Sequence, residues 1–551
     1  MSRIKVTNTA IIIEDYELGS NDTLEAPYKV FDPIYHKYNY FGLYYDKKNK
    51  KLYLHGGNNL WKVKNALNER FYDRISNHPY QTIENILIKY PPRDEEQFTA
   101  LRFMCDVDEY QENASIPFRV VALNTGKGKT YCSIATICYY KMKSIVITGS
   151  NSLLDQWESE ILKYTNLDKK DVVHISGSNI CNMILQDKSA KYRDAKIYLC
   201  SHGTLRSFGD TFGWDKVSAL FEYLGIGIKI FDEAHTNFNN VTMIDFFTNV
   251  WRTYYVTATP GRSNWKENRI FQISLSQVPL IDLFNEDKDP HTSYIAIKYN
   301  SRPSANDISK CKNKYGLDRM KYIDYITKKP EFYQMLRVIM DMALKVLFHP
   351  DPAKRGKVLI YIGTNDGILR VYYWIGENYP ELVGDIGIFT SLLPHDQKMI
   401  ERQKKLLLST TKSAGLGEHI DKLKMTIVLA EPFKSEIIAR QTLGRTRDNG
   451  TWYIEVVDMG FSYVRKFYFD KLPTFNKYAL DVSDSYMDNY ELEKRAISVE
   501  EERDDWRRVP LIFDDKRFDF DSVLPKKKEV DNGPRPAVTF HNKNKKKFFN
   551  D

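Results

Sequence analysis

The sequence predicts an α/β protein with two tandem lobes, each built on a parallel sheet. Apolar strand-like runs alternate with helix-like stretches through both halves of the chain, which is typical of a parallel sheet covered by helices on both faces. A glycine-lysine loop follows the first run of the series. The expected strands lie at 118–123, 144–148, 195–200, 226–231 and 253–257, and then at 357–362, 385–389, 405–410, 425–430 and 452–457.

A chain of 551 residues is too long for one hydrophobic core and suggests about three domains. We expect a small N-terminal α+β accessory module at 1–90, a first lobe at 91–285 and a second lobe at 286–480. The remaining residues, 481–551, form a charged, partly disordered extension with a basic end. Polar stretches within 261–330 favour a linker and surface loops between the lobes.

The N-terminal module contains two strand-like runs, 41–45 and 51–55, around the polar segment DKKNK, which predicts a hairpin. A helix should follow, with Trp61, Ala66, Leu67 and Phe71 on one face. The lysines of the hairpin tip either contact a nucleic-acid backbone or simply form a solvated turn.

The formal charge is +8, but the segment 526–547 alone carries eight basic and two acidic residues, or +6. The rest of the chain is nearly neutral, so a nucleic acid would have to bind through a local patch. The six cysteines lack metal-ligand spacing and should be buried, reduced thiols. No secretory signal or run of membrane-spanning length is evident, and we expect a soluble cytoplasmic protein without membrane partners.

The segment FRVVALNTGKGKT, residues 118–130, places a strand, a glycine-lysine loop and a helix in succession. Backbone N–H groups and the helix N-terminus would then face a polyphosphate, which predicts ATP as the ligand. Lys129 would contact the β and γ phosphates, and the Thr130 hydroxyl would contact Mg²⁺. The other loop residues in this prediction are Thr125, Gly126, Lys127 and Gly128. The strict pattern has glycine where Leu123 stands, and a tight surface turn is the alternative.

The predicted strand at 226–231 is followed by Asp232, Glu233, Ala234 and His235. A carboxylate at the end of a buried strand suits Mg²⁺ coordination, which we assign to Asp232, and Glu233 could orient the attacking water. Paired acids of this kind also occur as helix caps.

The second lobe should contain a long amphipathic helix that starts near residue 331 and stops before Pro350. Further on, QTLGRTR places Arg445 and Arg447 on a glycine-containing segment. These arginines are surface charges or, across a cleft between lobes, stabilise transition-state charge on the γ-phosphate, an effect of roughly 10³ to 10⁵ in rate.

Eight segments in order resemble the motifs of superfamily 2 helicases and translocases over residues 93–470. They are LNTGKGKT (123–130), TGSNSLLDQWESE (148–160), CSHGTL (200–205), DEAH (232–235), TATP (257–260), LIYIGTN (359–365), STTKSAGLG (409–417) and QTLGRTR (441–447). The resemblance implies two RecA-like lobes, ATP and Mg²⁺ as cofactors, and nucleic-acid-dependent ATP hydrolysis. DEAH combined with TATP, and the pair Gln156-Trp157, are most similar to phage UvsW-type branch-migration helicases.

The resemblance also implies roles for individual residues. Gln97 would read adenine, and Gly417 would lie near the ribose, although Glu418-His419 follows it where the family often has Gly-x-Asp. Arg445 is a better candidate than Arg447, because Asp448 occupies the usual place of the second arginine. Coupling between the two sites is assigned to His235, Thr257, Thr259 and Gln441. The nucleic-acid track is assigned to Ser150, Asn151, Ser201, Thr204, Thr364, Asn365, Thr411 and Lys412.

These residues lead to the hypothesis of a viral, phage-type DNA motor that acts on forked or branched DNA in replication and recombination. Small hydroxyl and amide side chains suit phosphate contacts without base reading, so DNA binding should be independent of sequence. Partners would be single-stranded or branched DNA and viral replication or recombination proteins. The alternatives are an RNA helicase or transcript-release ATPase of the same fold, and an ATP-binding scaffold of a viral assembly with little turnover.

Overall fold

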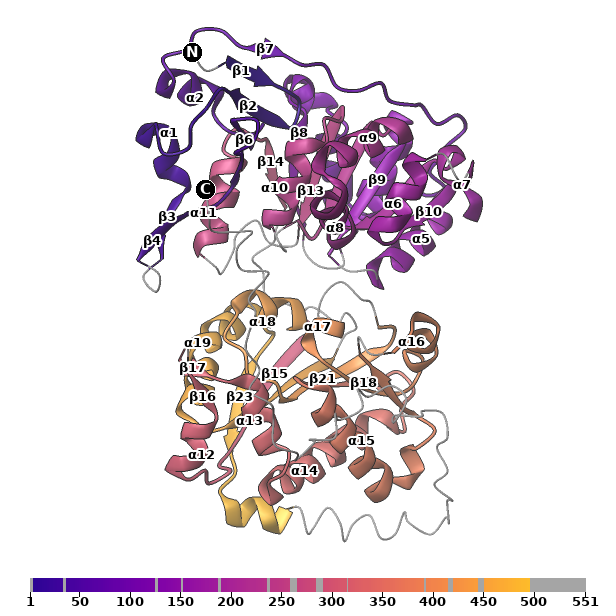
Figure 1. Cartoon of the computed structure of the whole chain (residues 1–551). Helices are drawn as coiled ribbons and strands as arrows, with labels where there is room; N and C mark the ends of the chain where they lie inside the picture. The colour runs from indigo at the N-terminus through magenta and orange to yellow at the C-terminus, as the bar shows by residue number, and fades with distance from the viewer. Residues whose placement is uncertain are drawn as a thin grey trace, which may run out of the picture.

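The computed structural model describes residues 3–32, 36–123, 127–149, 152–186, 190–234, 238–257, 265–283, 291–314, 316–390, 393–414, 420–443 and 450–495. Figure 1 shows two α/β lobes, with the N-terminal module beside the first. Both predicted parallel sheets are present. None of the described helices has the length and apolar character needed to cross a membrane. All six cysteines lie in the described part of the chain and are buried and free, as predicted.

Among the described residues, the first lobe holds a seven-stranded, fully parallel sheet in the order β10-β11-β9-β12-β13-β8-β14. Its strands are β8 (Phe118–Ala122), β9 (Ser144–Thr148), β10 (Val172–Ile175), β11 (Ile197–Ser201), β12 (Ile228–Asp232), β13 (Arg252–Thr257) and β14 (Leu280–Asp282). Its helices are α3 (Glu95–Met104), α4 (Lys129–Tyr140), α5 (Ser152–Tyr164), α6 (Ser178–Leu185), α7 (Ala190–Asp194), α8 (His202–Phe212), α9 (Trp214–Leu224), α10 (Phe238–Phe247) and α11 (Trp265–Ser274). The five predicted strands are all present, whereas the edge strands β10 and β14 were not predicted.

The described part of the second lobe also holds seven parallel strands, in the order β19-β20-β18-β21-β22-β15-β23. They are β15 (Thr292–Tyr299), β18 (Lys357–Ile362), β19 (Ile386–Phe389), β20 (Leu406–Ser409), β21 (Leu423–Ala430), β22 (Thr451–Asp458) and β23 (Val482–Tyr486). The helices are α12 (Ala305–Lys310), α13 (Arg319–Ile326), α14 (Pro330–Leu347), α15 (Asn365–Asn378), α16 (His395–Glu401), α17 (Thr411–Ala414), α18 (Glu436–Leu443) and α19 (Ser462–Tyr478). Helix α14 is the long amphipathic helix predicted from the sequence.

Two expectations for the second lobe are wrong. The stretch expected to be a linker contains β15, which pairs with β22 along all eight of its residues and buries Tyr294, Ala296 and Ile297. Strand β23 pairs with β15 beyond residue 480, where the charged extension was expected to begin. The second sheet therefore starts earlier and ends later in the chain than the sequence pattern indicates.

The N-terminal module forms a sheet in the order β5-β6-β2-β1-β7. Its strands are β1 (Arg3–Val6), β2 (Ala10–Glu14), β5 (Leu43–Asp46), β6 (Lys51–His55) and β7 (Asp73–Arg74), and a separate pair joins β3 (Lys29–Asp32) to β4 (Lys37–Tyr40). Strands β5 and β6 form the predicted antiparallel hairpin. The helices are α1 (Asp22–Glu25) and α2 (Leu60–Ala66).

The face predicted for α2 is confirmed for Ala66 and Leu67, which pack against the core of the module, and is wrong for Trp61 and Phe71. The helix ends at Ala66, so Phe71 lies outside it and is 80% exposed, while Trp61 is 68% exposed. Val63 is the residue that α2 buries. A helix of seven residues presents only a short face, and Val63 with the half-buried Leu60 and Leu67 fills it.

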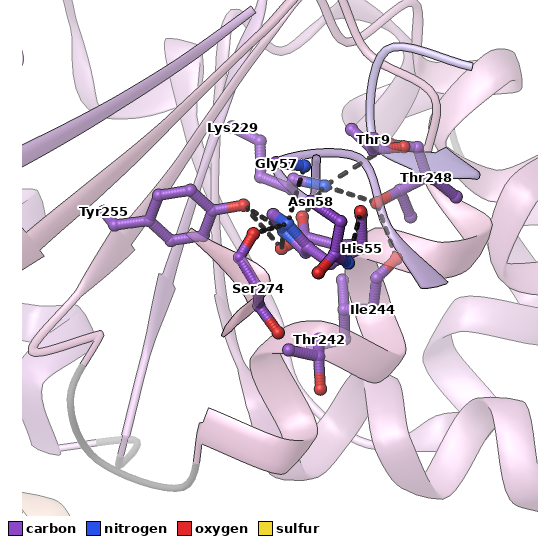
Figure 2. A network of polar contacts seen from close by, with 12 residues as sticks. Thr9, His55, Gly57, Asn58, Lys229, Thr242, Ile244, Thr248, Tyr255 and Ser274 are labelled. Atoms are coloured by element: carbon purple, nitrogen blue, oxygen red, sulfur yellow. Dashed lines mark hydrogen bonds and ion pairs between the residues drawn. The ribbon is translucent and has the colours of Figure 1, made fainter. Parts of the chain in front are cut away.

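A fully buried group of polar side chains joins the module to the first lobe (Figure 2). Lys229 on β12 pairs with Asp245 on α10, with 2.5 Å between Nζ and Oδ1. His55, the last residue of β6, places Nε2 3.2 Å from Asp245 Oδ2, and the Tyr255 hydroxyl donates to the same oxygen at 2.7 Å. The charges of Lys229 and Asp245 in the lobe therefore neutralise each other, and the His55 ring of the module supplies Asp245 with a further polar contact inside the protein.

Further hydrogen bonds extend this network on both sides (Figure 2). Lys229 Nζ also donates to the Thr248 hydroxyl at 2.5 Å, and the Thr9 hydroxyl of the module donates to the Thr248 carbonyl at 3.1 Å. Burial lowers the pKa of Lys229, although the charge of Asp245 opposes this. Burial raises the pKa of Asp245, but the charge of Lys229 and the contact with His55 outweigh it, so the pKa lies below its ordinary value.

Substituting Asp245→Ala should lower the free energy of unfolding by about 3 to 5 kcal/mol, because Lys229 would remain buried without its counter-charge. Urea unfolding at neutral pH measures this change. Asp341→Ala is the matched control, since Asp341 pairs with the largely exposed Lys345 at 2.7 Å, and it should change stability by no more than about 0.5 kcal/mol. Equal losses in the two variants would contradict the role of the network.

Candidate functional site

Three strand ends of the first sheet meet at one edge. Asp232, the last residue of β12, pairs with Val256 of β13, and Thr257 of β13 pairs with Ala122 at the end of β8. The chain leaves β8 into the glycine-lysine loop and leaves β12 into the acidic pair. Parallel pairing therefore brings the loop and the acids to the same edge, where α/β proteins commonly bind ligands.

The described end of the glycine-lysine loop leads directly into α4. Gly128 has φ of +92°, and a Cβ atom there would lie 2.2 Å from Gln97 Nε2, so a side chain would be strained and would clash. Gly128 precedes Lys129 as the N-cap and supplies no side-chain cap to the helix. The first N–H groups of α4 can therefore serve an anion. Thr125 and Gly126 lie outside the described residues.

Gln97 of α3 is buried against this loop. Its Nε2 donates to the Lys127 carbonyl at 3.2 Å, and its Oε1 accepts from the Arg93 N–H at 2.9 Å. Lys127 itself extends to Glu96, with 3.1 Å between Nζ and Oε1. Both ends of the Gln97 amide thus bond to backbone groups, so the residue fixes the shape of the loop; adenine reading by Gln97 stays a prediction.

Lys129 and Glu233 form an ion pair, with 3.0 Å between Nζ and Oε1. Both side chains are mostly buried. Glu233 has φ of +49°, a left-handed conformation that costs a residue with a side chain roughly 1–2 kcal/mol. This backbone turn comes directly after β12 and belongs to the segment that places the Glu233 carboxylate opposite Lys129 of the glycine-lysine loop.

Asp232 is a buried carboxylate with a donor on each oxygen. Oδ1 accepts from the Glu233 N–H at 3.0 Å, and Oδ2 accepts from the Trp157 indole N–H at 2.8 Å. Burial raises the pKa of Asp232 to about 6, and the charge of Glu233 adds to this rise, while Lys129 and the Trp157 hydrogen bond oppose it. Trp157 belongs to the Gln156-Trp157 pair of the helicase resemblance, and the sequence does not predict it as a site residue.

The oxygen donors at this edge fit a magnesium ion. Asp232 offers a carboxylate, and Thr130, the second residue of α4, offers a half-buried hydroxyl. Carboxylate and hydroxyl oxygens are hard ligands of the kind that Mg²⁺ prefers, together with water and phosphate oxygens. Each Asp232 oxygen accepts one of the two hydrogen bonds given above, and a carboxylate oxygen has a second lone pair.

The residues predicted to couple the sites are described only in part. Thr257 is buried at the end of β13, and its carbonyl accepts from the Leu123 N–H at 3.0 Å. Gln441 lies on α18, and its backbone alone is described. His235, Thr259, Gly417, Arg445 and Arg447 lie outside the described residues.

Two segments predicted to contact nucleic acid begin helices with buried hydroxyl groups. Ser201 caps α8 and accepts from the Thr204 N–H at 3.3 Å, and the two hydroxyl oxygens lie 3.1 Å apart. Thr364 caps α15 by accepting from the Gly367 N–H at 3.0 Å. These hydroxyl groups therefore bond within the protein, so their contact with a track stays a prediction. Ser150 and Asn151 lie outside the described residues.

A second buried acid follows a strand in the second lobe, and the sequence prediction missed it. Glu431 comes directly after β21; its Oε2 accepts from the Thr411 N–H at 2.8 Å, and its Oε1 accepts from the Thr411 hydroxyl at 2.5 Å. Arg319 approaches Glu431 Oε1 at 3.4 Å. The signal in the sequence is the same as for Asp232, a carboxylate at the end of an apolar strand. Thr411 is itself a track candidate, and the remaining two are Asn365, which follows the cap Thr364 on α15, and Lys412, which follows Thr411 on α17.

Comparisons with known proteins find sequences similar to part of this chain. Residues 89–262 match the family model described as type III restriction enzyme, res subunit. The chain is 24% identical over 189 residues to the general transcription and DNA repair factor IIH helicase/translocase subunit XPB of Enterocytozoon bieneusi, covering 32% of this chain and 30% of that protein. It is also 24% identical over 162 residues to putative helicase 161L of Invertebrate iridescent virus 6, covering 27% and 36%. The chain thus spans about a third of the length of these curated relatives.

Solved structures align along more of the chain but at low similarity. The crystal structure of T4 UvsW covers 88% of this chain and 99% of its own, with 14% identity and a TM-score of 0.32. S. cerevisiae Dbp5 bound to RNA and ADP BeF3 covers 74% and 97%, with 13% identity and a TM-score of 0.46. At these scores the alignments add nothing to the geometry described above. The family model and the two relatives confirm the predicted resemblance to superfamily 2 helicases.

His202, which follows Ser201 as the first residue of α8, makes stability depend on pH. It is 1% exposed, and burial lowers its pKa from 6.5 to about 4. The unfolded chain therefore binds more protons than the folded chain between these values, so stability should fall as the pH falls from 6.5 towards 4. This residue should account for about 2 kcal/mol of lost stability between pH 7 and pH 5.

The variant His202→Gln removes this titration and should show a pH dependence weaker by about that amount. Urea unfolding of both proteins at pH 7 and pH 5 measures the difference. Parallel losses in the two proteins would contradict a neutral, buried His202.

Proposed function

From this confirmed resemblance to superfamily 2 helicases, we propose that the chain is a nucleic-acid-dependent ATPase that moves along DNA. The observation that carries the proposal is the Lys129–Glu233 ion pair beside Asp232, at the strand edge that the glycine-lysine loop enters. Lys129 provides a cation for the phosphates, Asp232 a carboxylate for Mg²⁺, and Glu233 a second carboxylate for the attacking water. That combination is needed for hydrolysis of a nucleoside triphosphate.

In this mechanism the N–H groups at the start of α4 and the Lys129 ammonium hold the phosphates. Bound Mg²⁺, held by Thr130 and Asp232, would neutralise charge on the β and γ phosphates. When Lys129 turns to the phosphates, Glu233 is released from its ion pair and orients the attacking water. The left-handed turn at Glu233 keeps that carboxylate on the same side as the loop.

The second lobe would complete the motor. Arg445, with Arg447 as a weaker candidate, would stabilise the γ-phosphate, and lobe closure would then depend on the bound nucleotide. Gln97 and Gly417 would contact the adenosine part, and His235, Thr257, Thr259 and Gln441 would relay the state of the nucleotide. The track would cross both lobes along the segments that contain Ser201 and Thr364.

DNA is the proposed track because one relative is named as a DNA repair factor subunit and the matching family model is named for a restriction enzyme. Forked or branched DNA during viral replication or recombination is the finer proposal, drawn from the UvsW-type motif pattern. RNA is the alternative track. An ATP-binding scaffold without turnover is less consistent with the intact set Lys129, Thr130, Asp232 and Glu233.

Lys129→Ala should lower the rate of ATP hydrolysis at least about 100-fold, because one preorganised donor to the developing charge contributes this much.

Glu233→Gln should lower the turnover rate by a factor of about 10² to 10⁴, because the water loses its base, and should retain ATP binding. Phosphate release and binding of a fluorescent ATP analogue measure the two effects. Wild-type turnover in Lys129→Ala would refute the motor, and absent turnover in the wild-type protein would favour the scaffold.

The same assay with single-stranded DNA, duplex DNA, branched DNA and RNA identifies the track. We expect the largest stimulation by branched DNA and none by RNA, with Glu233→Gln as the inactive control. DNA affinity should fall with salt, with about 0.7 to 0.9 added to the logarithmic slope for each phosphate neutralised. Stimulation by RNA alone, or a salt slope near zero, would contradict a DNA track.

A further inference from the structure

The one polar group of Trp157, its indole N–H, donates a hydrogen bond to Asp232 of the candidate active site. The side chain is 2% exposed and lies on α5 within the hydrophobic core between the helices and the sheet. An indole ring has a single N–H donor and no acceptor. That donor lies 2.8 Å from Oδ2 of Asp232, on a different element of the lobe.

The second oxygen of Asp232 is held independently. Oδ1 accepts from the backbone N–H of Glu233 at 3.0 Å. With a single donor, the carboxylate could still rotate about its χ2 torsion, which is broad for aspartate. With donors on both oxygens, from the turn and from α5, the plane of the carboxylate is fixed.

A tryptophan that served packing alone would have no need to bond a side chain at the edge where nucleotide is proposed to bind. Its donor could equally use a backbone carbonyl, as the buried hydroxyl of Tyr254 does with the carbonyl of Met104 at 2.7 Å. Groups that orient a metal ligand through a hydrogen bond have strong effects on metal affinity, commonly 10- to 100-fold.

We propose that Trp157 is a positioning residue that holds the Asp232 carboxylate in the orientation needed for Mg²⁺ in the nucleotide complex. This inference rests on the proposed ATPase function and adds a residue of α5 to its machinery. Trp157 itself touches neither nucleotide nor metal, and it acts only through Asp232.

The test compares Trp157→Phe with Tyr254→Phe. Each substitution removes one buried hydrogen-bond donor from the first lobe and keeps an aromatic ring. Trp157→Phe also removes part of the indole and leaves a cavity, so it should lower the melting temperature more than Tyr254→Phe does. The Trp157→Phe variant should need about 10-fold more Mg²⁺ for half-maximal binding of a fluorescent ATP analogue and for half-maximal ATP hydrolysis. Binding of the analogue in EDTA should be unchanged, and Tyr254→Phe should show the wild-type Mg²⁺ requirement.

A wild-type Mg²⁺ requirement in Trp157→Phe would refute the positioning role and leave the ATPase proposal intact. Wild-type protein that neither binds nor hydrolyses ATP would refute the ATPase proposal instead. An increased Mg²⁺ requirement in both variants would also overturn the inference, because the effect would then follow from lost stability.

A second measurement does not require Trp157→Phe to fold. In the ¹⁵N NMR spectrum of the indole groups, Asp232→Asn should shift one solvent-protected resonance, because the acceptor of Trp157 loses its charge. In the complex of the wild-type protein with ATP, the same resonance should shift when Mg²⁺ is added. It should keep its position when EDTA is added in place of Mg²⁺. If no indole resonance responds to Asp232→Asn, the hydrogen bond is absent and the inference falls.

Discussion

The site depends on the parallel pairing of three neighbouring strands. Since β12, β13 and β8 run in the same direction and lie side by side, the three segments that leave them emerge at one edge of the sheet. The backbone hydrogen bonds of these strands are buried, so the sheet cannot shift its register without losing them. Residues separated by about a hundred positions, such as Lys129 and Glu233, are therefore held within contact distance.

Within this frame, the electrostatics are arranged around one buried carboxylate. Burial alone would favour the neutral form of Asp232, and the adjacent Glu233 adds to that tendency. Lys129 and the N–H of Trp157 supply the opposing interactions, and Lys129 is shared with Glu233. An incoming phosphate would compete with Glu233 for Lys129, and a cation would compete with Lys129 for the charge of Asp232, which makes the edge sensitive to the ligand that it holds.

Sequence patterns predict the parts of this architecture that depend on local chemistry. The buried strand ending in Asp232 and the turn at Gly128 carry their signal in a few adjacent residues. Strand β15 was missed because the stretch around it is polar and because its partner β22 lies about 160 residues away, so pairing decides its structure. Trp157 shows the other limit: its large apolar ring favours burial, but the acceptor of its N–H depends on how α5 packs against the sheet.

The buried network around Lys229 has a consequence for the independence of the N-terminal module. Lys229 precedes Asp232 by three residues on the same strand, and its counter-charge Asp245 contacts His55 of the module. The first residues of the chain are thus joined by a short series of bonds to the strand that ends at the nucleotide edge. The module and this strand therefore share one buried network, and a chain that lacked residues 1–90 would leave Asp245 and the Thr248 carbonyl without the groups that His55 and Thr9 supply.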